Sequence, residues 1–135
     1  MTSAPVRMNP PELPDAGKVG YSQISVAEAG RLAFVSGQVA LRADGAPVPE
    51  GLNAQARIVF DNLGAALAAL GAGRERIVQM RIYMTDLRPE TMAVVMPQLA
   101  EFLDGVQPSV TGVGVTALAE PELQLEIEMV VSLPA

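Results

Sequence analysis

Glu126 is the residue whose type and position point most directly to chemistry. It lies in the segment Leu123–Val131, where apolar residues occupy every odd position and polar residues occupy most even ones. This alternation is typical of a β-strand with one buried face. Glu126 then lies in the middle of the polar face, where a carboxylate can act as a general base or orient a water molecule.

The segment before it, Ser109–Thr116, also reads as a strand, and one of its faces is nearly bare. Val110, Gly112 and Gly114 share that face, directly after Pro108. Glycines weaken a strand unless something must approach the face closely. We therefore expect a ligand site where the bare face and the carboxylate come together. The alternative is that the glycines only admit the backbone of another subunit.

The absence of cysteine and histidine limits the chemistry further. The chain has no disulfide, no thiolate nucleophile, no imidazole base and no zinc ligand set of the usual kind. Proton transfer must fall to carboxylates, tyrosine, lysine, backbone groups or water. No clustered Asp/Glu spacing indicates a metal, and we expect no cofactor.

The charge balance and the hydropathy pattern exclude several partners. The net charge is −6 and the few basic residues are scattered, whereas nucleic-acid binding usually needs a basic stripe. No apolar run approaches the roughly 20 residues that span a bilayer. The first 14 residues do not resemble a secretory signal, so we expect a cytoplasmic protein.

Two segments have the period of amphipathic helices. In Leu52–Leu70, apolar residues recur every three or four positions, and Gly71 follows as a natural C-terminal stop. A second helix is expected over Pro89–Leu103, because proline suits the first turn. Pro97 inside it should kink or split the helix.

The remaining elements read as strands. Val6–Asn9 is a short opening strand, Ile24–Ala29 and Arg31–Ala40 suggest a hairpin around Gly30, and Arg76–Asp86 alternates again. With the two strands near the C-terminus the order is β-β-β-α-β-α-β-β. We therefore predict one domain over residues 1–135, an α+β two-layer sandwich with both helices on one face of a mixed sheet.

The other face of that sheet is expected to be uncovered. It carries polar and charged residues that can form pairs, including Arg81, Tyr83 and Glu128. An uncovered amphipathic face invites a partner, so we expect a homo-oligomer.

Several short motifs resemble the RidA/YjgF family in order and spacing, over about residues 21–132. They are Tyr21-Ser22-Gln23, Phe34-Val35-Ser36-Gly37-Gln38, Gln55 with Asn62-Leu63, Leu67 and Gly71, Tyr83-Met84-Thr85-Asp86-Leu87, Pro108, and Leu125-Glu126-Ile127-Glu128. The resemblance implies a chorismate-mutase-like α+β fold and a homotrimer whose sheets close into a barrel, with a small-molecule pocket in each intersubunit cleft. It also implies hydrolysis of reactive enamine or imine intermediates, such as 2-aminoacrylate, to 2-keto acids and ammonia.

The same resemblance assigns roles to residues. Glu126 matches the carboxylate that positions or activates the attacking water, and Tyr21 matches the tyrosine at the pocket rim. Ser36 and Gly37 match the segment lining the cleft, and Tyr83 belongs to a further matching motif. These assignments make Glu126 and Tyr21 the candidate catalytic residues.

One position departs from the family pattern. The family deaminases carry an arginine two residues after the proline, where it grips the substrate carboxylate, and this chain has Val110 there. A bidentate guanidinium–carboxylate contact contributes about 1.5–3 kcal/mol. We therefore expect weak or absent deamination of 2-aminoacrylate-type compounds. Arg81 replaces the missing cation if it reaches the same cleft; otherwise it pairs with Glu126 or Glu128.

Three functions remain open at this point. The first is a deaminase-type hydrolase for an uncharged or larger imine, enamine or carbonyl compound, with Val110 and Gly112 lining the substrate pocket. The second is a non-catalytic protein that binds a small metabolite. The third, the ribonuclease role sometimes attached to this family, is disfavoured by the acidic charge and the missing histidine.

Overall fold

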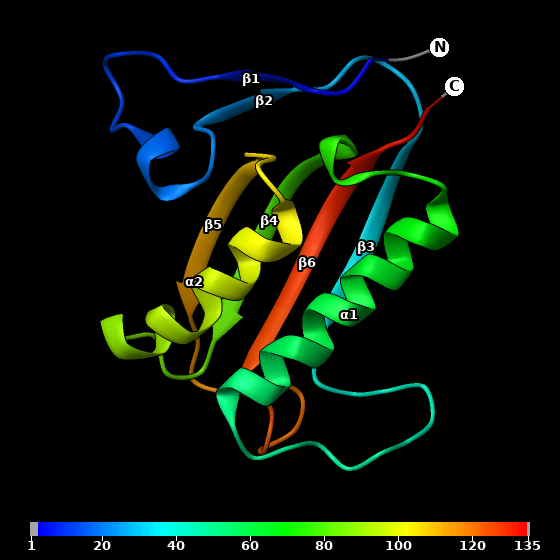
Figure 1. Ribbon diagram of the computed structural model, residues 1–135, viewed down its shortest axis with the longest axis vertical. Coiled ribbons are helices and arrows are strands. Elements are labelled where there is room, and N and C mark those ends of the chain that lie inside the picture. Colours follow the sequence, from blue (N-terminus) through cyan, green and yellow to red (C-terminus); the bar gives the residue numbers. More distant parts are fainter. Residues whose placement is uncertain (1–2, 135) are drawn as a thin grey trace.

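The computed structural model describes residues 3–134, which form a mixed α+β structure (Figure 1). In chain order the elements are β1 (Val6–Met8), η1 (Ala16–Val19), β2 (Ile24–Val26), β3 (Leu32–Gln38), α1 (Leu52–Leu70), η2 (Arg74–Arg76), β4 (Ile77–Met84), α2 (Pro89–Leu103), β5 (Ser109–Gly114) and β6 (Leu125–Ser132). The expected order of strands and helices is confirmed. Both long helices lie on one side of the main sheet, as Figure 1 shows.

The main sheet has four strands in the order β3-β6-β4-β5. Strand β6 is antiparallel to both β3 and β4, whereas β4 and β5 run parallel. A parallel pair needs a long crossover, and α2 supplies it between these two strands. The sheet is therefore mixed, as predicted.

The predicted hairpin around Gly30 is wrong. Strand β2 pairs with β1 in a separate two-stranded ribbon, and β3 pairs with β6 instead. Ala33 and Val35 of β3 pack against the main core, so β3 gains more by joining the central strand than by pairing with a three-residue neighbour. Alternation within a segment identifies a strand but does not name its partner.

The two helices begin and end where the sequence pattern placed them. Gly71 ends α1 in the left-handed conformation, with φ 64°, and its backbone N–H bonds the last carbonyls. The helix α2 runs from Pro89 through Pro97 to Leu103 without being split. Pro97 is exposed, so its ring lies on the outer side of the helix. The core between helices and sheet is built around Leu63, Leu67, Met80, Val95 and Ile127.

Within residues 3–134, no helix covers the opposite face of the sheet (Figure 1). Along β4 and β6 the residues facing this side alternate with buried ones, and Arg81 pairs in register with Glu128 and Tyr83 with Glu126. Phe34 of β3 is 75% exposed on the same side. We call this surface the open face.

Candidate functional site

A cavity of about 500 Å³ lies on the helix side of the sheet, at the edge formed by β5. It is lined by residues from the N-terminal segment, β4, the link between β4 and α2, α2 and β5, almost all of them apolar: Val19, Tyr21, Ile82, Leu87, Met92, Met96, Val110 and Gly112. We call this cavity the apolar pocket. Its size is in the usual range for a small-molecule site. None of its lining side chains is charged.

Tyr21 reaches the pocket because the backbone around it is tied down on both sides. Gly20 adopts a left-handed conformation with φ 94° and closes the η1 turn. The next residue, Ser22, donates its backbone N–H to the Pro108 carbonyl at 3.0 Å and forms a parallel bridge with Ser109. The Tyr21 hydroxyl makes no hydrogen bond within residues 3–134, so it is available to a ligand.

The bare face predicted for β5 does form one wall of this pocket. Met80 pairs with Val110 and Ile82 pairs with Gly112, and both partners belong to the helix-facing core. A Cβ added at Gly112 would meet no atom within 4 Å. The glycine is therefore not required by packing within this chain, and its missing side chain leaves space in the pocket.

Glu126 does not lie beside that bare face. Strand β4 runs between β5 and β6, and Glu126 pairs with Tyr83 on the open face, whereas Gly112 pairs with Ile82 on the helix side. The expectation that the carboxylate and the glycine surface share one side of the sheet is wrong for a single chain. Strands β5 and β6 follow one another in the sequence, but β4 lies between them in the sheet. The sequence pattern gave no indication of this strand order.

Glu126 instead lies over Gly37. A Cβ added at Gly37 would be 2.2 Å from the Glu126 Oε2 atom, closer than any real contact. The ladder between β3 and β6 is irregular between Val35 and Gln38, and such bulges redirect the chain locally. Ser36, within this irregularity, is exposed. Glycine at position 37 thus gives the Glu126 carboxylate its place.

Arg81, Tyr83 and Glu128 form a polar group next to Glu126 on the open face. The Arg81 Nη1 atom lies 3.7 Å from Glu128 Oε1, and the Tyr83 hydroxyl donates to the same oxygen. This hydrogen bond to a carboxylate, followed by partial burial, raises the pKa of Tyr83 above its ordinary value. Arg81 therefore has its partner on the open face, and it does not line the apolar pocket.

The candidate residues thus form two groups on opposite sides of the sheet. Tyr21, Val110 and Gly112 meet in the apolar pocket, while the open face carries Glu126 and Gly37 together with Arg81, Tyr83 and Ser36. Sequence reasoning missed Met92, Leu87 and Val19 as pocket residues. Met92 and Met96 are four residues apart on α2, which gives a helical face but no indication of what it covers.

Within residues 3–134, no group of three or more acidic side chains is arranged to hold a metal ion. None of the helices in that range is both long and apolar enough to cross a membrane. The apolar pocket presents one phenol, and the open face presents carboxylates, a guanidinium and a second phenol.

The fold and the pocket define a two-layer α+β protein with a small apolar cavity at a sheet edge. A family model described as Endoribonuclease L-PSP matches residues 14–133. The RutC family protein YjgH of Escherichia coli (strain K12) is 37% identical over 98 residues, 73% of this chain and 74% of that protein.

Solved structures agree with this likeness. The Rid-family protein YyfB of Yersinia pestis superposes with a TM-score of 0.90 at 32% identity, covering 97% of this chain and all (100%) of that one. RidA from the Antarctic bacterium Psychrobacter sp. PAMC 21119 gives a TM-score of 0.70 at 29% identity, covering 84% and 88%. The chain belongs to the RidA/YjgF family. Membership supports a role as a small-molecule deaminase or an endoribonuclease-like protein.

Proposed function

We propose that this chain is a deaminase-type hydrolase for a small neutral imine, enamine or related carbonyl compound. The observation that carries the proposal is the uncharged lining of the apolar pocket. A substrate carboxylate placed against Val110 and Met96 would lose its hydration without gaining a cation. A neutral substrate buries no charge there, and its apolar part gains from burial.

The proposal requires a second copy of the chain. Glu126 and the apolar pocket lie on opposite sides of one sheet, so one chain cannot bring them to one substrate. In the homotrimer that we propose, the open face of one subunit contacts the pocket edge of the next. The substrate then lies in the intersubunit cleft, with its apolar part against Val110 and its reacting carbon near the neighbour's carboxylate.

The proposed reaction is the hydrolysis of the carbon–nitrogen double bond. The Glu126 carboxylate accepts a proton from water as the water oxygen forms a bond to the imine carbon. Glu126 returns that proton to the nitrogen, the second proton of the added water follows from the new hydroxyl group, the carbon–nitrogen bond breaks, and the products are a carbonyl compound and ammonia. Tyr21 is suited to donate a hydrogen bond to the substrate nitrogen or oxygen from the pocket rim.

A non-catalytic role in binding a small metabolite is the second candidate. The separation of Glu126 from the pocket within one chain favours it, because burial alone can hold an apolar ligand without any carboxylate. Both candidates use the same pocket, and they differ only in whether Glu126 contributes.

The substitution Glu126→Gln separates the two candidates. Imines are generated in situ by an amine oxidase from neutral amines, and ammonia release is followed by a coupled NADH assay. We expect a loss of at least a hundredfold in kcat with little change in affinity for the ketone product, measured by calorimetry. The matched control is Glu120→Gln, which removes the same charge from an exposed turn and should leave turnover unchanged.

Two results would decide against the enzyme. Wild-type protein that binds ketones but never accelerates ammonia release supports the binder. Equal turnover in Glu126→Gln and wild type would mean that the carboxylate is not the base.

A further inference from the structure

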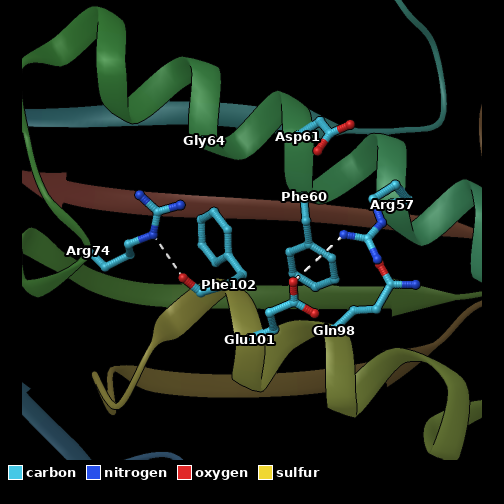
Figure 2. A pocket seen from close by; sticks show the side chains of 8 residues that line it. All are labelled: Arg57, Phe60, Asp61, Gly64, Arg74, Gln98, Glu101 and Phe102. Carbon is cyan, nitrogen blue, oxygen red and sulfur yellow. Dashed lines mark hydrogen bonds and ion pairs between the residues drawn. The ribbon is translucent and has the colours of Figure 1, made fainter.

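A second cavity, of about 280 Å³, lies between the two helices (Figure 2). Its lining is Arg57, Phe60, Asp61 and Gly64 from α1, Gln98, Glu101 and Phe102 from α2, and Arg74 from η2. It shares no lining residue with the apolar pocket. We call it the interhelical cavity.

Two aromatic rings form the floor of this cavity. The ring centroids of Phe60 and Phe102 are 5.4 Å apart, with the ring planes inclined by 36°. In Figure 2 the rings lie in a row between the guanidinium groups of Arg74 and Arg57, which mark the two ends. The floor therefore suits a flat apolar body, and the ends suit polar groups.

The Arg74 guanidinium is held in place by two contacts and has no carboxylate partner among residues 3–134. Its Nε atom donates to the Phe102 carbonyl at 2.8 Å, and its guanidinium carbon lies 4.6 Å from the centre of the Phe102 ring. These two contacts leave its Nη atoms without an acceptor among residues 3–134. A fixed guanidinium with a free edge is suited to bind a carboxylate.

The other charges around the cavity compensate one another. Asp61 pairs with Arg42 at 3.4 Å, and Glu101 lies 3.8 Å from Arg57. Each carboxylate of the lining thus has its own cation, so Arg74 is the uncompensated charge.

Gln98 provides a second unsatisfied group. Its amide nitrogen donates to the backbone carbonyl and the side-chain oxygen of Asn53, at 2.9 and 2.7 Å. Its Oε1 atom is buried and accepts no hydrogen bond from any described residue. The residue as a whole is only 9% exposed. Buried acceptors normally have a donor, so Gln98 leaves an unsatisfied acceptor in the wall of the cavity.

We propose that the interhelical cavity binds a flat aromatic carboxylate that carries a hydrogen-bond donor opposite its acid group. The carboxylate pairs with Arg74, the ring lies over Phe102 and Phe60, and the donor reaches Gln98 at the other end. The cavity volume fits a ligand of a single ring with a short side chain. This site is independent of the proposed hydrolase activity.

The test uses three matched probes and the whole protein. Binding of 3-(4-hydroxyphenyl)propanoate is compared with 3-phenylpropanoate, which lacks the donor, and 4-ethylphenol, which lacks the carboxylate. Calorimetry and two-dimensional NMR give affinities and the shifted residues. We expect the full probe to bind at least tenfold more tightly than either analogue and to shift signals of Gly64 and Phe102. No binding at 10 mM, or equal binding of all three, would overturn the proposal.

Variants at Gly64 locate the site. A Cβ there would lie 3.8 Å from Arg74 Nη2 and 4.0 Å from Phe102 Cε1, both ordinary contacts. Gly64→Ala should therefore fold normally, since alanine favours the helix, and should weaken binding slightly. Gly64→Leu fills the cavity and should abolish binding. Unchanged affinity in a folded Gly64→Leu protein would contradict the assignment.

Two more variants complete the design. Arg74→Gln removes the charge without filling the cavity, and it should reduce the affinity for the full probe to that for 4-ethylphenol; it also serves if Gly64→Leu does not fold. Gly112→Leu narrows the apolar pocket and should leave binding of the probe unchanged. Loss of binding in Gly112→Leu alone would place the probe in the apolar pocket and overturn the proposal.

Discussion

Replacing Val110 with arginine should turn the apolar pocket into a site for carboxylate-bearing imines. The position lies on the helix side of β5, pairs with Met80, and contacts the pocket that Met96 closes from α2. The space beside Gly112 is open, because no atom of the described residues lies within 4 Å of where its Cβ would be. An arginine at 110 therefore has room to extend along β5 toward the pocket opening without displacing a neighbour.

The magnitude follows from two opposing terms. Losing a partly buried valine costs about 1 kcal/mol, less than the roughly 1.5–3 kcal/mol of a fully buried one. For a chain of this size that lowers Tm by about 3–5 °C. A bidentate contact to the substrate carboxylate contributes about 1.5–3 kcal/mol, which corresponds to an increase of about 10- to 150-fold in kcat/KM if the contact persists in the transition state.

The assay is ammonia release from 2-iminopropionate, generated from alanine by an amino-acid oxidase, beside a neutral imine generated from an amine. We expect Val110→Arg to gain on the charged substrate and to lose on the neutral one. Val110→Met is the control, because it fills the same space without a charge. Wild-type protein that hydrolyses 2-iminopropionate as fast as folded Val110→Arg would refute this expectation, since no cation would then be missing.

Three further expectations concern residues around the site and the core. Gly37→Ala would put a Cβ 2.2 Å from the Glu126 carboxylate, so it should displace that side chain. We expect turnover to fall at least tenfold while Tm falls by only a few degrees. Unchanged turnover would show that the position of Glu126 is not critical. Gln55 is fully buried; its side chain donates to the Pro49 and Glu122 carbonyls and accepts from the Gln124 backbone N–H, at 2.8–2.9 Å. Gln55→Leu should therefore lower the free energy of unfolding in urea by about 3 kcal/mol or more. The exposed control Ala65→Leu should change it by less than about 1 kcal/mol. The raised pKa of Tyr83 means that its protonated form is favoured in the folded state, so the stabilisation is present below the ordinary pKa of tyrosine and is lost as pH rises through the folded value. Ultraviolet titration should show this tyrosine ionising at higher pH than free tyrosine. Glu128→Gln should return its pKa toward the ordinary value.

The helices were predictable because their signals are local. Leu52–Leu70 has a full apolar stripe and a glycine at its end, and Pro89 marks the first turn of α2, so both ranges agree with the structure. The strands were predictable as strands for the same reason, with ends that agree or are displaced by at most three residues. The pairing of the strands was not predictable, because it depends on which segments meet across the whole chain.

The apolar pocket was only partly foreseeable. Two glycines and Val110 on one parity indicated a bare strand face, and the structure has a cavity there. The sequence pattern did not predict that β4 would lie between β5 and β6, so that Glu126 faces away from that cavity. A strand pattern gives the side on which a residue lies relative to its own neighbours, but the side relative to another strand depends on the register between them.

That register makes assembly the central physical question for this chain. Side chains on a strand alternate between faces, so no rotamer of Glu126 reaches the pocket without passing through the sheet. Moving the carboxylate across would need a one-residue slip of β6, which would bring Leu125 and Ile127 out of the core onto the open face. The buried apolar area of β6 therefore fixes Glu126 on the open face of its own chain, and the proposed reaction needs the carboxylate of a second copy.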